Sequence, residues 1–115
     1  MIIVRYANQP AAAVFEDRIE FYPRIAALEA DHPIRRWVFG LAFFALRVTN
    51  GHIAGPYSDR RAAHFARCAL LPDDDFDSAS HLTDDRVAEL FNVPMDQVRE
   101  KRADVFACAV KGPSE

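Results

Sequence analysis

The chain has 115 residues, which is enough for one domain that buries its own core without disulfides or a structural metal. Half of the residues are hydrophobic and 27% are charged, the balance of an ordinary soluble globular protein. The net charge of -3 at pH 7 argues against broad binding to nucleic acids or anionic membranes, because both attract a positively charged protein surface.

An N-terminal antiparallel sheet is predicted from runs of β-branched and aromatic residues. Residues 2–6 form the first predicted strand, which the Asn-Gln-Pro sequence at 8–10 should end as a turn. Residues 13–16 and 19–22 are the next two strands, because the two residues between them suit a hairpin. Residues 24–30 are expected to form a connector that can hold one helical turn.

A long helix is predicted over residues 33–49. It starts at the Asp-His-Pro sequence at 31–33, which offers a capping side chain and a proline where no N–H is needed. It ends at Asn50-Gly51, since both residues tolerate the left-handed conformation that closes helices. Residues 37–46 are all apolar or glycine, so we expect a buried central helix with no face in water.

Three further helices are predicted. Ser58 should cap one that ends before Pro72, Thr83 should cap the next, and a break at 92–94 separates it from a last helix over residues 94–110. The side chains expected to face the core are Ala62, Phe65, Ala66, Ala69 and Leu70, then Val87, Leu90 and Phe91, then Met95, Val98, Val105, Phe106 and Ala109.

The sequence favours a cytoplasmic setting. The longest apolar run, residues 37–46, is shorter than the ~20 residues of a membrane helix. The first residues lack the apolar region of a signal peptide, so we expect no export. Cys68 and Cys108 lie far apart in apolar surroundings, which favours two reduced, buried thiols over a disulfide.

Two weaker site patterns are not expected to bind metal. His52, Asp59 and His64 could supply donors, but Asp59 and His64 are five residues apart and misaligned on a helix. The aspartates of residues 73–77 imitate a calcium loop, yet serine stands where that loop needs glycine. We therefore expect surface histidines and a solvated acidic loop.

The order of sheet, buried helix and a helix ending in Ala-Leu-Leu-Pro resembles the ImmA/IrrE family of small zinc peptidases. The segment DRRAAHFARCALLP is similar to the family's Glu-x-x-Ala-Asn-x-Phe-Ala-x-x-Leu-Leu-x-Pro, with Phe65, Ala66 and Pro72 in register. LTDDRVAELFNVPMDQVREKR looks like the family's closing helices, and RRWVFGLA looks like the lead-in to its His-Glu-x-x-His. The resemblance covers residues 19–102. It implies an α+β, zincin-like single domain over residues 1–111, with 112–115 as a frayed tail.

The zinc chemistry of that family is missing from the matching positions. Two histidines four residues apart must hold the zinc, and the glutamate between them activates water. The resemblance places Phe43, Phe44 and Arg47 on these three positions, and none can donate a lone pair to zinc. Asp59 falls on the family's third ligand, a glutamate. We expect an Arg47–Asp59 ion pair in place of the metal; the alternative is that both side chains point to solvent.

The sequence therefore predicts a non-catalytic pseudo-metallopeptidase that needs no cofactor and acts by protein contact. A groove lined by Phe43, Phe44, Arg47 and Asp59 is the candidate interaction surface, unless the old cleft is packed shut. The resemblance implies a regulatory protein associated with phages or mobile elements. A repressor, a host factor or a defence component would be its partner.

Two other functions stay open. The segment 86–102 has the spacing of a helix-turn-helix, so Arg99, Lys101 and Arg102 are candidate nucleic-acid contacts of a DNA-binding regulator. Acidic residues in the same helix dilute this positive charge. The second alternative is a metallopeptidase with unorthodox ligands.

Overall fold

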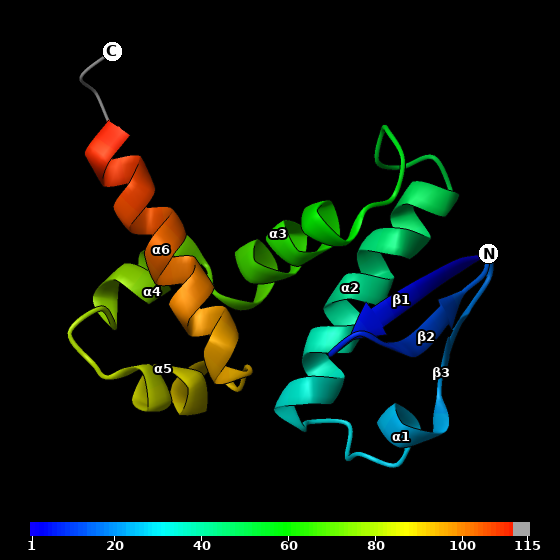
Figure 1. Cartoon of the computed structure of the whole chain (residues 1–115), viewed down its shortest axis with the longest axis horizontal. Coiled ribbons are helices and arrows are strands. Elements are labelled where there is room, and N and C mark those ends of the chain that lie inside the picture. Colours follow the sequence, from blue (N-terminus) through cyan, green and yellow to red (C-terminus); the bar gives the residue numbers. More distant parts are fainter. Residues whose placement is uncertain (112–115) are drawn as a thin grey trace.

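The computed structural model describes the backbone of residues 1–111 and the side chains of residues 1–106. The chain begins with an antiparallel sheet of three strands in the order β1-β2-β3 (Figure 1). The strands are β1 (Ile2–Tyr6), β2 (Gln9–Val14) and β3 (Ile19–Phe21). The predicted small sheet and its first strand are confirmed, whereas the second strand starts and ends earlier than expected.

The first hairpin turns at Ala7 and Asn8, not at residues 8–10. Both turn residues have positive φ angles, 54° and 62°, the backbone that matches the twist of a two-residue hairpin. Pro10 lies within β2, opposite Arg5, where the strand register shifts. Such a bulge tolerates the missing N–H of proline, which explains why Pro10 does not end the strand.

Helix α1 (Pro23–Ala26) leads into α2 (Pro33–Thr49), the long helix that lies on the sheet. The bounds of α2 are those predicted, and the Nδ1 atom of His32 accepts the backbone N–H of Ile34 at 3.1 Å. The expectation that no face of α2 meets water is wrong. Phe39 is 50% exposed and Phe43 37%. The sheet covers one side of α2 and α3 a second, so a third side stays open.

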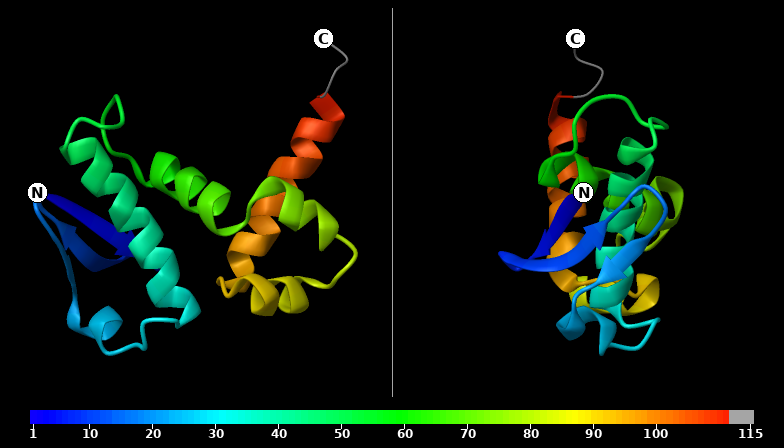
Figure 2. Two further views of the ribbon diagram at one scale, coloured as in Figure 1. Left: turned by 180° about the vertical axis from the view of Figure 1, so that it is seen from behind. Right: turned by 90° about the vertical axis from the view of Figure 1, so that its right-hand side faces the viewer.

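Helix α3 (Asp59–Leu70) crosses α2, and its buried side chains are Ala62 and Ala66. The backbone N–H of Arg61 donates to Ser58 Oγ, which confirms the predicted cap. Ala69 was expected in the core but is exposed. Figures 1 and 2 show why, because the end of α3 extends past α2 toward α4.

A second group of helices follows, comprising α4 (Asp73–Ser78), α5 (Asp84–Phe91) and α6 (Met95–Lys111). The predicted acidic loop is wrong, since residues 73–78 are helical. Three aspartates in the first turn of α4 suit the positive end of the helix dipole, and Phe76 anchors the helix in a core. That second core contains Leu71, Phe76, Ala79, Val87, Val93 and Val98.

Most of the predicted inner face of the last helix is exposed. Val98 is buried, but Met95, Val105 and Phe106 are exposed, as is Leu90 on α5. Figure 1 shows the reason for Val105 and Phe106, since the C-terminal part of α6 projects beyond the shorter α4 and α5. Ala109 lies outside the residues whose side chains are described.

Two clusters of buried side chains thus support one compact α+β domain. The first joins the sheet, α1, α2 and α3, and Leu70 packs against both clusters. Arg36 on α2 donates to the backbone oxygens of Phe91 and Asn92 at 2.7 Å each, and Asn92 Nδ2 donates to the oxygen of Asp31. Within residues 1–111, every helix is too short or too polar to cross a bilayer.

Candidate functional site

The interface of α2 with α3 is closely packed where the resemblance places a metal. A Cβ atom added to Gly40 would lie 3.1 Å from the Cβ of Ala66, so the two backbones approach closely. One turn along α2, Phe44 is only 4% exposed, and its ring centroid lies 5.3 Å from Phe65 and 6.1 Å from Tyr57. Gly40 and Phe44, four residues apart on α2, therefore both lie against α3. Neither carries a metal donor.

The predicted Arg47–Asp59 ion pair is wrong. Among the side chains that the structure describes, Arg47 makes no ion pair, and its guanidinium lies 5.8 Å from the ring centroid of Phe43. Asp59 instead accepts a hydrogen bond of 3.2 Å from the Tyr57 hydroxyl. Spacing along the chain placed both residues near one cleft, but it did not fix the direction of either side chain.

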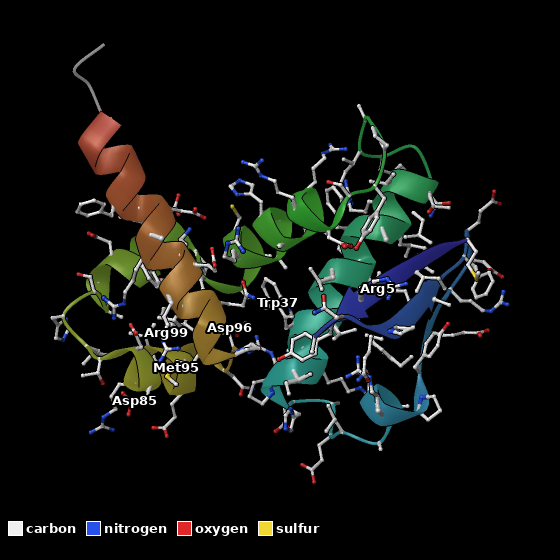
Figure 3. The ribbon with its side chains drawn as sticks, viewed as in Figure 1. Arg5, Trp37, Asp85, Met95, Asp96 and Arg99 are labelled. Carbon is white, nitrogen blue, oxygen red and sulfur yellow. The ribbon has the colours of Figure 1, made fainter. Side chains whose placement is uncertain are left out.

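The four residues of the predicted groove do not line one groove. Asp59 lines a shallow groove of about 240 Å³ together with Trp37 and Leu41. Phe44 is buried between the helices, whereas Phe43 is exposed on α2. Figure 3 shows three residues around the shallow groove, Arg5 on β1, Trp37 on α2 and Asp96 on α6.

The tyrosines beside this shallow groove stay neutral. Burial raises the pKa of Tyr57 well above its usual range, and the nearby Asp59 carboxylate adds to the effect. The pKa of Tyr6 is also raised, first by burial and then by Asp96. Both phenols are therefore protonated at neutral pH and act here as neutral hydrogen-bonding groups.

An exposed aromatic surface lies beside the packed interface. We use this name for Phe39 and Phe43 on α2, with the partly buried Phe65 of α3 at its edge. Phe39 and Phe43 stack with their ring centroids 6.1 Å apart, and Phe43 lies 6.3 Å from Phe65. Sequence reasoning missed Phe39, although its spacing of four residues from Phe43 places both on one helix face. This surface offers aromatic rings on a rigid helix, the kind of group that anchors protein contacts.

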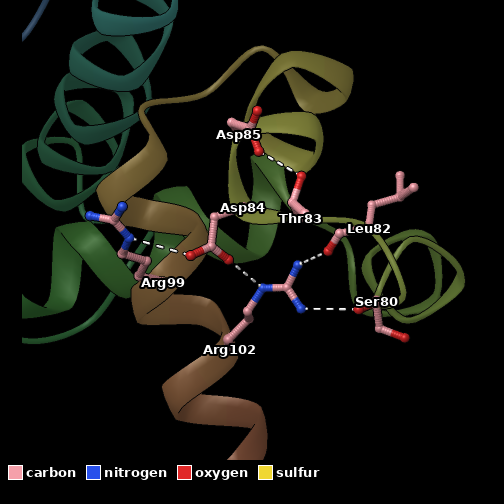
Figure 4. Close-up of polar contacts among 7 residues, drawn as sticks. All are labelled: Ser80, Leu82, Thr83, Asp84, Asp85, Arg99 and Arg102. Carbon is pink, nitrogen blue, oxygen red and sulfur yellow. Dashed lines mark hydrogen bonds and ion pairs between the residues drawn. The ribbon is translucent and has the colours of Figure 1, made fainter.

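The candidate nucleic-acid contacts on α6 are held by acidic groups and carbonyl oxygens of the chain itself. The two oxygens of Asp84 lie 3.3 Å from Arg99 Nε and 2.8 Å from Arg102 Nε (Figure 4). Arg102 also donates to the backbone oxygens of Ser80 and Leu82. These arginines brace α6 against the start of α5 and the loop before it. At the same helix start, the Thr83 hydroxyl donates to the Asp85 carboxylate.

Lys101, the third candidate, is only 6% exposed. Its ammonium group donates to the carboxylate of Asp73, which lowers the pKa of that carboxyl through the hydrogen bond and the positive charge. All three predicted cations therefore face intramolecular acceptors. A phosphate backbone would have to compete with these contacts for the positive charge.

Metal-binding side chains are dispersed. Within the described side chains, no three His, Cys, Asp or Glu residues lie close enough together to hold a metal ion. His64 and Cys68 form a pair on α3, with Nε2 and Sγ 3.7 Å apart. Cys68 is exposed and not buried as predicted, because it lies on the outer face of α3. Cys108 falls outside the described side chains.

Comparison with known proteins does not assign this chain to a family. No protein-family model, curated protein or solved structure matches this chain. Function is therefore inferred from the described residues together with the sequence resemblance.

Proposed function

We propose that this chain is a non-catalytic, ImmA/IrrE-like protein of zincin-like fold that acts by binding another protein. The resemblance in segment order supports the fold assignment. The packing of Phe44 between α2 and α3 supports a non-catalytic role, because aromatic carbon fills the position opposite Phe65 and Tyr57. The observation that carries the binding function is the exposed aromatic surface on α2.

Phe39 and Phe43 present apolar area to water without an evident role in the core. Burial of apolar surface stabilises a complex by about 25 cal/mol per Å² before the costs of association. Stacked rings on a helix lose little side-chain freedom on binding, so more of this gain is kept. Arg47, at the end of the same helix face, adds a charged group for hydrogen bonds at the rim.

The resemblance suggests the class of partner. A repressor, a host factor or a defence component would bind to this surface, in a regulatory role linked to a phage or a mobile element. A cytoplasmic location would fit such a partner.

Affinity capture from the native host tests the proposal. The wild-type chain should capture a partner that the double variant Phe39→Ser with Phe43→Ser does not retain. Leu90→Ser is the matched control, because Leu90 is 63% exposed but lies on α5. If all three proteins retained the same partner, or if only Leu90→Ser lost it, Phe39 and Phe43 would not be the binding surface.

The metallopeptidase alternative has a separate test. Elemental analysis of the purified chain should find no stoichiometric zinc, and added zinc should produce no peptide cleavage. Bound zinc at one equivalent, together with cleavage that a chelator abolishes, would refute the non-catalytic proposal.

A DNA-binding regulator is the second candidate. It is favoured by the joining of α5 to α6 through a short turn in which Val93 is buried. The internal contacts of Arg99 and Arg102 oppose it. In a salt-titrated DNA shift assay we expect weak binding that Arg99→Ala leaves unchanged. Tight, salt-dependent binding that is lost in Arg99→Ala and Arg102→Ala would favour this candidate instead.

A further inference from the structure

A second groove lies between α3, α4 and α6. Its volume is about 550 Å³, within the range of ligand-binding clefts. Figures 1 and 2 show α3 leading into α4, with α6 running across it. The accessible wall is mostly apolar, and its lining includes Cys68, Phe76 and Val105. None of these residues belongs to the aromatic surface, so the two regions are independent.

The lysine and the arginine of this groove are already paired, and His64 also lines it, beside Cys68. Lys101 donates to Asp73. Arg67 Nε lies 3.5 Å from Asp104, and another nitrogen of Arg67 donates to Gln97. Neither cation is free to attract an anionic ligand. A phosphate group would also meet the carboxylates of the rim.

Two carboxylates of the groove have no such partner. Asp74 and Asp77 line it from α4, three residues apart and thus on one helix face. Within residues 1–106, neither side chain makes an ion pair or a hydrogen bond to another side chain. The groove therefore combines an apolar wall with an unneutralised negative edge.

We propose that this groove binds a basic segment of a partner protein. An arginine or lysine of the segment would place its charged group beside Asp74 and Asp77. Its methylene stem and an apolar neighbour would lie against Val105 and the edge of Phe76, because long basic side chains bury their stems while the charge stays near water. A guanidinium can bond to two carboxylate oxygens at once, which favours arginine over lysine.

Lys101 provides an internal example of the same chemistry. Its stem is buried in the wall of the groove, and its ammonium lies 6.0 Å from the ring centroid of Phe76. The charge is met by Asp73 at the rim. A ligand side chain would repeat this arrangement on the same helix, at Asp74 and Asp77. The inference does not depend on the proposed binding role of α2.

Fluorescence anisotropy with the full chain tests this inference. The probe is a labelled twelve-residue peptide of alternating leucine and arginine pairs, and the matched peptide carries glutamine in place of arginine. We expect the arginine peptide to bind the wild-type chain and the glutamine peptide not to. The double variant Asp74→Asn with Asp77→Asn loses two surface charge pairs with the arginines of the peptide, so it should bind the peptide about five-fold more weakly.

The control must separate this site from general attraction to an acidic protein. Glu29→Gln with Glu89→Gln removes the same charge outside the groove, and neither side chain has an ion-pair partner among the described residues. We expect less than about a two-fold change in this variant, because surface charges act weakly at a distance in salt. Equal weakening in the two double variants, or no binding by the wild-type chain, would overturn the proposal.

Cys68 gives a second, local readout. It is exposed and lines the groove, so a bound peptide should slow its reaction with a bulky maleimide. A Cys108→Ser background leaves Cys68 as the only thiol. Unchanged labelling at a saturating peptide concentration would contradict binding in the groove. Spermidine that binds as tightly as the peptide, with the same loss in Asp74→Asn with Asp77→Asn, would overturn the assignment to a protein segment.

Discussion

Arg36 is predicted to hold the second helical group against α2. One of its nitrogens donates to the backbone oxygens of Phe91 and Asn92, both at 2.7 Å, in a partly buried position. These oxygens belong to the C-terminal end of α5, where backbone oxygens have no N–H partner within the helix. Arg36→Met keeps most of the apolar stem and removes both bonds.

The cost can be worked from the two contacts. Hydrogen bonds to a charged group contribute about 1.5–3 kcal/mol, and the two bonds share one nitrogen, so they count as one strong interaction. A positive charge at a helix C-terminus adds about 0.5 kcal/mol. We therefore expect Arg36→Met to lower the free energy of unfolding by about 2–3.5 kcal/mol. A chain of 115 residues has about 6–17 kcal/mol in total, so the loss is substantial.

Urea denaturation measures this loss, and amide hydrogen exchange locates it. Protection should fall more in α5 and α6 than in the sheet, because the lost bonds join α2 to α5. Arg86→Met is the matched control, since Arg86 lies on α5 and makes no hydrogen bond or ion pair among the described side chains; its effect should stay within about 0.5 kcal/mol. A stability change below that value in Arg36→Met, or an equal loss of protection in the sheet, would refute the reasoning.

Three further predictions concern groups of the two cores. Lys101→Met should change the free energy of unfolding by less than about 1 kcal/mol, because the Asp73 carboxylate is already exposed to water. Lys101→Ala also removes three buried methylenes worth about 2 kcal/mol, so equal losses of the two variants in urea denaturation would show that the charge matters more than the stem. Gly40→Leu should lower the free energy of unfolding by about 1–3 kcal/mol by overpacking against Ala66, and adding Ala66→Gly should recover part of this loss. A Gly40→Leu variant that is more stable than the wild-type chain would contradict the close approach of α2 and α3. Because the pKa of Tyr57 is raised in the folded chain, its neutral phenol favours folding below pH 10, and this contribution is lost as the pH rises through the folded-state pKa. Tyr57→Phe should therefore reduce the loss of thermal stability above pH 10, and parallel pH profiles of the two proteins would contradict a buried phenol.

The sequence predicted elements best where their boundaries depend on local chemistry. Helix α2 has the expected bounds because Pro33 and the Asn50-Gly51 pair act within one turn of each end. The second strand was misplaced because Pro10 reads locally as a turn residue. The bulge beside Arg5 that accommodates it depends on pairing with another strand, which one segment alone does not reveal.

Tertiary packing decided the elements and contacts that the sequence missed. The aspartates of α4 favour a solvated loop by composition, but Phe76 finds a core beneath them and the segment becomes helical. The same limit applies to the candidate site. An all-apolar α2 does not reveal which side α3 leaves open, and spacing alone could not show that Asp59 bonds to Tyr57 and not to Arg47.

The open side of α2 is the proposed protein-binding surface because folding does not require aromatic residues there. Ala42 and Ala45 are fully buried in the core cluster that includes the sheet, and Gly40 lies against Ala66 of α3, so these small residues allow the close packing that the core needs. Phe39 is half exposed, and Phe43 contacts Phe65 at the edge of α3 while the rest of its ring is exposed. A polar side chain at these positions would be compatible with a helix and would be hydrated more favourably. Because two adjacent, stacked and exposed rings occupy these positions, we propose that another surface covers them during function.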